Sequence, residues 1–225
     1  MGSKLDEKIL CVEKLGYFLG LESNKSLFSP KTTDQEILDF YSKKTSFGRE
    51  HNLQRLVPIW LERGIAEKNP NYLQPIPYIV VMSYNDENDE ILTYIRSKKG
   101  GEKRLHDKVS IGIGGHINDF DVRSKFGGFF PIILDCLYRE IREETGVSLY
   151  EHPHLLSQEG WFYSPVKEVD RVHLCLLHVL RIQKNLINLN YFDPETGKRA
   201  EWLPKEKISV LENLETWSIE ALKYI

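Results

Sequence analysis

The chain of 225 residues carries 30 Lys and Arg against 33 Asp and Glu, and its formal net charge is -3. This near balance gives no general attraction to nucleic acids or membrane surfaces, so we expect neither kind of partner. No apolar run approaches the roughly 18 residues that span a bilayer, and the first residues do not resemble a signal peptide. Cys11, Cys136 and Cys175 show no CxxC spacing, so a cytoplasmic protein is expected.

Residues 1–72 are expected to form an α+β extension ahead of a main domain at 73–225. Within the extension, the sequence predicts a strand inside residues 8–21 and a short amphipathic helix over residues 35–44. Residues 53–75 contain several prolines and a glycine. This stretch is therefore predicted to be broken strand and loop rather than one helix.

The main domain shows alternating strand and helix patterns. Its β-rich runs predict two hairpins, a strand that ends in a glycine pair, and a short strand near the C-terminus. In chain order these are residues 76–84 with 90–97, 109–117, 154–165 with 170–182, and the residues around Trp202. A helix is predicted after the last strand. Together these elements predict an α/β fold.

The most regular predicted helix covers residues 131–146, "PIILDCLYREIREETG". Pro131 suits its first turn, Gly146 suits the residue after its last turn, and apolar residues recur between them with helical spacing. Its second half places Glu140, Glu143 and Glu144 on one face, because residues three and four apart lie within about 60° of each other around the helix axis.

Three carboxylates on one helix face repel one another, and an exposed like-charge pair four residues apart costs about 0.2–0.5 kcal/mol. The residues alone leave two explanations open. The face can be a solvated acidic surface relieved by Arg139 and Arg142. Alternatively, it can hold a divalent cation such as Mg²⁺, which prefers carboxylate oxygens, water and the oxygens of a substrate phosphate.

The stretch "REIREETGV" at 139–147, preceded by "GIGGHI" at 112–117, resembles the REUxEExGU signature of the Nudix hydrolases, where U is an aliphatic residue. The resemblance implies an α/β/α sandwich around a mixed β-sheet. It also implies a hydrolase that uses Mg²⁺ or Mn²⁺ to cleave a diphosphate linkage in a nucleoside diphosphate derivative, by attack of a metal-activated water. Homodimers are frequent in this family.

By the same resemblance, Glu140, Glu143 and Glu144 take the positions of the metal-binding and catalytic glutamates. Arg139 takes the position of the arginine that orients them, and we expect it to act through Glu143. Gly115 stands where the family often offers a backbone carbonyl to the metal. The chemistry agrees, because cations neutralise phosphoryl oxygens and a carboxylate can accept the proton of the attacking water.

The front half of the family signature is absent. Pro131 stands where its glutamate is expected, Lys125 stands where its glycine is expected, and an insertion separates Gly115 from the helix. Asp119 or Asp121 could supply the missing acid, or both could belong to a solvated loop. The number of metal ions is therefore open.

Basic residues gather just before the glycine pair. Arg96, Lys103 and Arg104 belong to a basic stretch over residues 96–108. The stretch suits substrate phosphates, but it is also compatible with a charged loop that binds nothing. We select these three residues as candidate substrate ligands.

Three more residues are candidates outside the signature. His116 could contact a phosphate or cap a turn, and Glu201 is a weaker candidate for metal contact. Cys136 is expected to be a small buried residue, because the helix packs closely there. Its position does not suit the nucleophile of an isopentenyl diphosphate isomerase, which is the least favoured reading. A catalytically silent nucleotide sensor is the second alternative to a hydrolase.

Overall fold

The computed structural model describes residues 4–14, 46–48, 57–83, 89–97, 105–122, 129–152, 154–164, 169–191 and 200–225. The helix predicted over residues 35–44 lies outside these ranges. The described chain divides into two compact units. The first comprises Met1–Pro77, His116–Cys136 and Gly160–Leu176, and the second comprises Tyr78–Gly115, Leu137–Glu159 and Leu177–Ile225.

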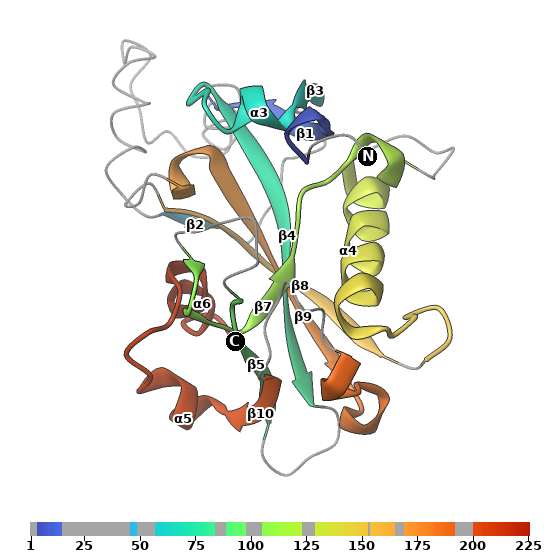
Figure 1. The fold of residues 1–225 in the computed structure, drawn as a ribbon, viewed down its shortest axis with the longest axis vertical. Coiled ribbons are helices and arrows are strands. Elements are labelled where there is room, and N and C mark those ends of the chain that lie inside the picture. Colours follow the sequence, from blue (N-terminus) through green and yellow to red (C-terminus); the bar gives the residue numbers. More distant parts are fainter. Residues whose placement is uncertain are drawn as a thin grey trace. The chain divides into compact units, whose positions relative to one another are not determined.

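Groups of strands are separated and followed by helices along the chain, as Figure 1 shows, and the predicted α/β class is confirmed. The strands are β1 (Lys8–Glu13), β2 (Ser46–Gly48), β3 (Ile59–Glu62), β4 (Tyr72–Ser83), β5 (Glu90–Ile95), β6 (Val109–Ser110), β7 (Gly112–Gly114), β8 (Leu155–Tyr163), β9 (His173–Ile182) and β10 (Ala200–Pro204). The main path through the sheet follows the order β10-β5-β4-β9-β8-β2.

The α-helices of the described residues are α3 (Arg63–Ala66), α4 (Phe129–Thr145), α5 (Lys205–Ser209) and α6 (Thr216–Ala221). Short 3₁₀ helices cover Lys4–Asp6, Asp119–Asp121, Val169–Val172, Lys184–Leu186 and Leu189–Tyr191. Within the described part of the chain, every helix is too short or too polar to cross a bilayer.

In the first unit, β1 pairs antiparallel with two strands. Ile9 lies opposite Leu61 of β3, and Val12 lies opposite Leu73 of β4. The four central residues of β1 are all buried, so both faces of this strand pack against apolar side chains. The main core of this unit consists of Leu10, Val12, Leu73, Ile117, Ile132, Ile133, Cys136, Trp161, Tyr163, Leu174 and Leu176.

In the second unit, β5 pairs antiparallel with β10, β4 and β6. Strand β7 pairs with β4, with Ile113 opposite Ile79. The predicted hairpin of residues 76–84 and 90–97 is therefore confirmed as β4 and β5. The core of this unit consists of Ile79, Val81, Leu92, Tyr94, Ile113, Leu137, Ile141, Val147, Leu149, Leu180, Ile182 and Ile187.

Helix α4 confirms the most regular sequence prediction. It begins at Phe129, two residues before Pro131, and this position is compatible with proline because the first backbone N–H groups of a helix have no intrahelical partner. It ends at Thr145. Gly146 follows with φ of 75°, a conformation that glycine adopts easily, and its backbone N–H donates to the carbonyl of Arg142 at 2.9 Å.

Other boundaries differ from the predictions. Strand β4 begins at Tyr72 rather than at residue 76 and includes Pro75 and Pro77. Both prolines lie between the part of β4 that pairs with β1 and the part that pairs with β7. Proline has no backbone N–H, but at these positions neither of the two pairings loses a hydrogen bond. Residues 109–117 form two short strands instead of one, and the C-terminal region contains two short helices instead of one.

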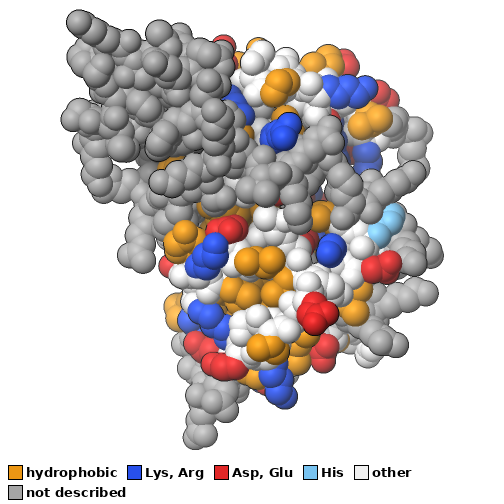
Figure 2. All heavy atoms as spheres, turned by 90° about the vertical axis from the view of Figure 1, so that its left-hand side faces the viewer, with side chains coloured by type: hydrophobic (Ala, Val, Ile, Leu, Met, Phe, Trp, Pro, Cys, Tyr) orange, Lys and Arg blue, Asp and Glu red, His pale blue; other side chains and the backbone are white. Residues whose placement is uncertain are grey.

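Charges of both signs are interspersed on the face shown in Figure 2. Basic and acidic side chains of the described residues alternate there with hydrophobic ones. This mixed surface agrees with the small net charge of -3.

Replacing Gly112 with alanine should destabilise the protein, because a Cβ at this position would lie 2.0 Å from Cζ of Tyr78. The tyrosine ring cannot easily move, since it is buried and its hydroxyl donates to Oε1 of Glu215 at 2.9 Å. Overpacking of this kind costs about 1–3 kcal/mol, so the free energy of unfolding in urea should fall by at least that amount. Gly64→Ala is the control, because its nearest neighbour would be the Leu5 carbonyl oxygen at 3.3 Å. Equal free energies for wild type and Gly112→Ala would contradict this packing.

Candidate active site

The three predicted glutamates lie on the C-terminal half of α4, in the second unit. Glu140 is 8% exposed, Glu144 is partly buried and Glu143 is exposed. The face thus runs from a buried carboxylate to a solvated one. A fully solvated acidic surface does not describe it, because desolvating Glu140 next to two other carboxylates raises the cost of their repulsion.

Arg139 joins two of these carboxylates. Its Nη1 donates to Oε1 of Glu140 at 2.6 Å and to Oε2 of Glu143 at 3.1 Å. The sequence prediction was that Arg139 acts through Glu143, and the shorter contact is to Glu140. The guanidinium is itself largely buried, with 11% of its side chain exposed, so solvent screens these contacts only weakly. Arg139 therefore partly neutralises the face and fixes the direction of both carboxylates.

Gly115 lies directly against the Glu140 carboxylate. A Cβ at Gly115 would meet Oε1 of Glu140 at 2.3 Å and Oε2 at 2.8 Å. A side chain at this position would displace the end of the Glu140 side chain, so glycine lets the backbone that follows β7 approach the buried carboxylate closely. Carboxylate oxygens beside a backbone segment form the oxygen-rich environment that suits Mg²⁺ or Mn²⁺, and the residues present fit such a cation.

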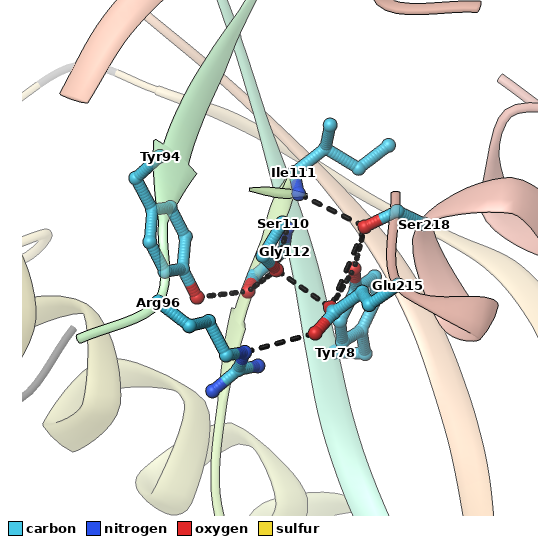
Figure 3. Close-up of polar contacts among 8 residues, drawn as sticks. All are labelled: Tyr78, Tyr94, Arg96, Ser110, Ile111, Gly112, Glu215 and Ser218. Atoms are coloured by element: carbon cyan, nitrogen blue, oxygen red, sulfur yellow. Dashed lines mark hydrogen bonds and ion pairs between the residues drawn. The ribbon is translucent and has the colours of Figure 1, made fainter. Parts of the chain in front are cut away.

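A second polar cluster of the second unit surrounds Glu215 (Figure 3). Arg96 Nε donates to Oε2 of Glu215 at 2.8 Å, and Oε1 accepts from Ser110 at 2.6 Å and from Tyr78 at 2.9 Å. Glu215 is 3% exposed. These donors satisfy the hydrogen bonding of the buried carboxylate, which holds the Arg96 side chain in one orientation.

The same cluster attaches the C-terminal helix to the strands beside it. Ser218 of α6 accepts a hydrogen bond from the backbone N–H of Ile111 at 3.0 Å. Tyr94 donates to the carbonyl of Gly112 at 2.7 Å, and the Arg96 guanidinium carbon lies 5.8 Å from the centre of the Tyr94 ring. Helix α6 and strands β5 and β7 are thereby linked around Arg96.

Electrostatics connect this cluster with the acidic face of α4. Burial is the main cause that raises the pKa of the Tyr94 hydroxyl, Arg96 acts in the opposite direction, and Glu144 adds to the increase. Glu144 therefore contributes to the electrostatic environment of the ring beside which Arg96 lies. Burial favours a lower pKa for Arg96, but Glu215, Tyr94 and Tyr78 together outweigh it and raise that pKa, so the guanidinium stays charged.

Sequence reasoning selected Arg96 and missed the partner that orients it. Glu215 lies 119 residues from Arg96 and 105 residues from Ser110 along the chain. An isolated glutamate or serine at such separations carries no spacing signal. Only the packing of α6 against the strands brings these side chains together.

The other predicted site residues lie in different parts of the chain. Lys103 and Arg104 lie outside the described residues. Glu201 is exposed on β10, where it pairs with Thr93 of β5. His116 belongs to the first unit, and its Nε2 lies 2.8 Å from Oε1 of Gln74.

The two aspartates of the insertion and Cys136 belong to the first unit. Asp119 is exposed, whereas Asp121 is buried and its Oδ2 accepts from the backbone N–H of Asn118 at 2.8 Å. Asp121 therefore stabilises its own turn. Cys136 is fully buried, as expected for a small packing residue, and its Sγ lies 3.6 Å from the carbonyl oxygen of His116.

Comparisons with known proteins bear on this site. A model of the NUDIX domain matches residues 75–225. Over 159 residues the chain is 30% identical to protein YmaB of Bacillus subtilis (strain 168), a match that covers 70% of this chain and 73% of the relative. The crystal structure of Tm1382, described as a putative Nudix hydrolase, matches with a TM-score of 0.57 and 25% identity over 96% of both chains.

The NUDIX domain of Shewanella oneidensis NrtR, crystallised with ADP ribose, is a further structural match. Its TM-score is 0.51 at 12% identity, over 68% of this chain and 85% of the other. At this identity the likeness concerns the fold alone.

Gly115→Ala should weaken binding of Mn²⁺ or Mg²⁺ while the protein stays folded. The new methyl group would displace the Glu140 carboxylate, which lies within 2.8 Å of it. Disturbing the residues that orient a ligand typically costs about 10–100-fold in metal affinity, and we expect a loss in this range. Mn²⁺ titration followed by electron paramagnetic resonance measures it. Glu151→Gln, at an exposed glutamate shortly after α4, is the control. Unchanged affinity in Gly115→Ala would show that this close approach does not serve a metal.

Proposed function

Because the chain belongs to the Nudix family, we propose that it is a metal-dependent hydrolase that cleaves a diphosphate linkage in a nucleoside diphosphate derivative. The observation that carries this proposal is the carboxylate face of α4. There, Arg139 contacts Glu140 and Glu143, and Gly115 leaves room for the buried carboxylate of Glu140. A purely structural helix gains nothing from such crowding of like charges.

Mg²⁺ or Mn²⁺ would be held by the carboxylates of Glu140, Glu143 and Glu144, with the Gly115 carbonyl as a further candidate ligand and Glu201 as a weaker one. When bound, the cation supplies Lewis-acid stabilisation of the charge on the phosphate oxygens. A carboxylate of the trio that is not committed to the cation accepts the proton of the attacking water. Arg139 keeps the carboxylates in place, so little reorganisation accompanies the reaction.

Among the proposed phosphate ligands, Arg96 is the one whose orientation is best fixed by contacts with described residues. Arg96 contacts Glu215 through Nε, so the two Nη groups of its planar guanidinium can donate hydrogen bonds to phosphate oxygens. Glu215 acts as a positioning residue. Lys103, Arg104 and His116 remain proposed contacts for the other phosphate oxygens. Residues 1–72 are proposed as an extension that, together with the insertion before α4, selects the group attached to the diphosphate.

ADP ribose supports the choice of the first compounds to test. The NUDIX domain of Shewanella oneidensis NrtR was crystallised with it, and it is a nucleoside diphosphate linked to a sugar. We propose nucleotide sugars and related diphosphates as the substrate class for this chain.

The direct test is a panel of nucleoside triphosphates, nucleotide sugars and dinucleotides, assayed with Mg²⁺. Wild type should hydrolyse at least one member, and Glu143→Gln should lower kcat/KM at least about 100-fold, because it removes one charge from the metal-binding face. Glu151→Gln, at an exposed glutamate shortly after α4, should retain the activity. Equal activity in wild type and Glu143→Gln would rule out the assignment of this face. Ligand-induced thermal stabilisation without turnover of any member would favour a nucleotide sensor instead.

The role of Arg96 is tested by its dependence on Glu215. Arg96→Ala should raise KM about tenfold or more with a smaller change in kcat, since a phosphate contact made before and during the reaction contributes to binding. Glu215→Gln should give a smaller rise in KM, because the Nε contact weakens but the guanidinium remains. Arg181→Ala removes an exposed arginine that pairs with Asp89 at 3.0 Å and should leave KM unchanged. A wild-type KM in Arg96→Ala would exclude the phosphate contact.

A further inference from the structure

A second group of metal-ligating side chains lies in the first unit. One ligand atom each from Glu67, His116 and His173 lies within 4.8 Å of the others. The three residues come from separate parts of the chain: Glu67 follows α3, His116 follows β7, and His173 begins β9. None of them belongs to the acidic face of α4.

The distances are close to those of a bound transition metal. Oε1 of Glu67 lies 3.6 Å from Nε2 of His116 and 3.8 Å from Nε2 of His173. Zinc binds such nitrogen and oxygen atoms at about 2.0–2.1 Å, so two ligands of a tetrahedral site are roughly 3.3–3.4 Å apart. Small side-chain movements would bring the Glu67 oxygen and the two imidazole nitrogens to the separation expected around a zinc ion.

The surroundings favour a single divalent ion over ion pairs alone. One protonated imidazole would suffice to pair with Glu67, yet two imidazole nitrogens approach the same carboxylate oxygen. If both rings were protonated, two positive charges would stand with ring centres 5.5 Å apart, with His173 only 8% exposed. Two neutral imidazoles and one carboxylate are an established set of protein ligands for a divalent cation.

Gln74 offers an oxygen for a fourth position. The residue is fully buried, and its Oε1 lies 2.8 Å from Nε2 of His116. A metal ion bound to Nε2 of His116 would take the place of a proton on that nitrogen, so the nitrogen would no longer donate to Gln74. The amide oxygen of Gln74 or a water molecule would then lie beside the ion. Arg63 opposes cation binding, because its Nε lies 3.5 Å from the same Glu67 oxygen.

We propose that Glu67, His116 and His173 form a binding site for a divalent transition-metal ion of the zinc type, separate in its ligands from the carboxylates of α4. Two imidazoles with one carboxylate prefer such an ion to Mg²⁺, which prefers oxygen ligands and water. The ion would connect the end of α3, the segment after β7 and the start of β9.

Cobalt binding tests the site directly, because Co²⁺ reports a four-coordinate site of nitrogen and oxygen ligands through visible absorption bands. Full-length protein treated with chelator should take up one Co²⁺ that gives such bands, and Zn²⁺ should displace it. His173→Ala and Glu67→Gln should each weaken this binding at least about tenfold. Glu143→Gln, on the α4 face, and His154→Ala, at a histidine of the second unit, should keep it.

Two further measurements keep the test decisive. If His173→Ala fails to fold, Glu67→Gln decides, since the Glu67 side chain is 22% exposed and its replacement is nearly isosteric. Arg63→Gln should tighten Co²⁺ binding, because it removes a competing cation from the Glu67 oxygen. The proposal is overturned if wild type binds no Co²⁺ with visible bands, or if both Glu67→Gln and His173→Ala keep them.

Discussion

Repulsion among three carboxylates on one face of α4 is the constraint on which the candidate active site depends. Glu140 is buried, and Glu143 and Glu144 lie one turn further along the helix. Among the described residues, Arg139 contacts two of the three. The face therefore carries an electrostatic cost that a divalent cation would offset, and this cost would contribute to metal affinity.

The backbone in and directly after β7 lies close to this face of α4. Two glycines permit close approaches of the backbone. Gly112, in β7, lies against the ring of Tyr78, and Gly115, directly after β7, lies against the carboxylate of Glu140. Tyr78 is in turn fixed by Glu215, which also orients Arg96. The proposed phosphate ligand Arg96 is thus held by a buried network that includes Ser218 of α6, and β7 runs from this network to Gly115, beside the Glu140 carboxylate.

The sequence was sufficient for features that are local. Helix α4, its glycine stop and the register of its glutamates all follow from spacing within one segment, and so does the hairpin of β4 and β5. The strand boundaries were less predictable, because the prolines within residues 53–75 suggested a break, yet Pro75 lies between paired parts of β4.

Residues that meet only through tertiary packing could not be found from spacing. Glu215 reaches Arg96 across 119 residues of sequence. His116 was recognised as a candidate for phosphate contact, but Glu67 and His173 gave no reason to be grouped with it. Their proximity is created by the packing of α3 and β9 in the first unit.

The central claim is that a divalent cation relieves the crowding on α4, and thermal unfolding of wild type and Glu144→Gln tests it most directly. With chelator, the variant should unfold at the same temperature as wild type or higher, because one negative charge has been removed from the face. With Mg²⁺, wild type should gain more stability than the variant. A variant that is less stable than wild type under chelator, together with equal Mg²⁺ responses in both proteins, would contradict the account.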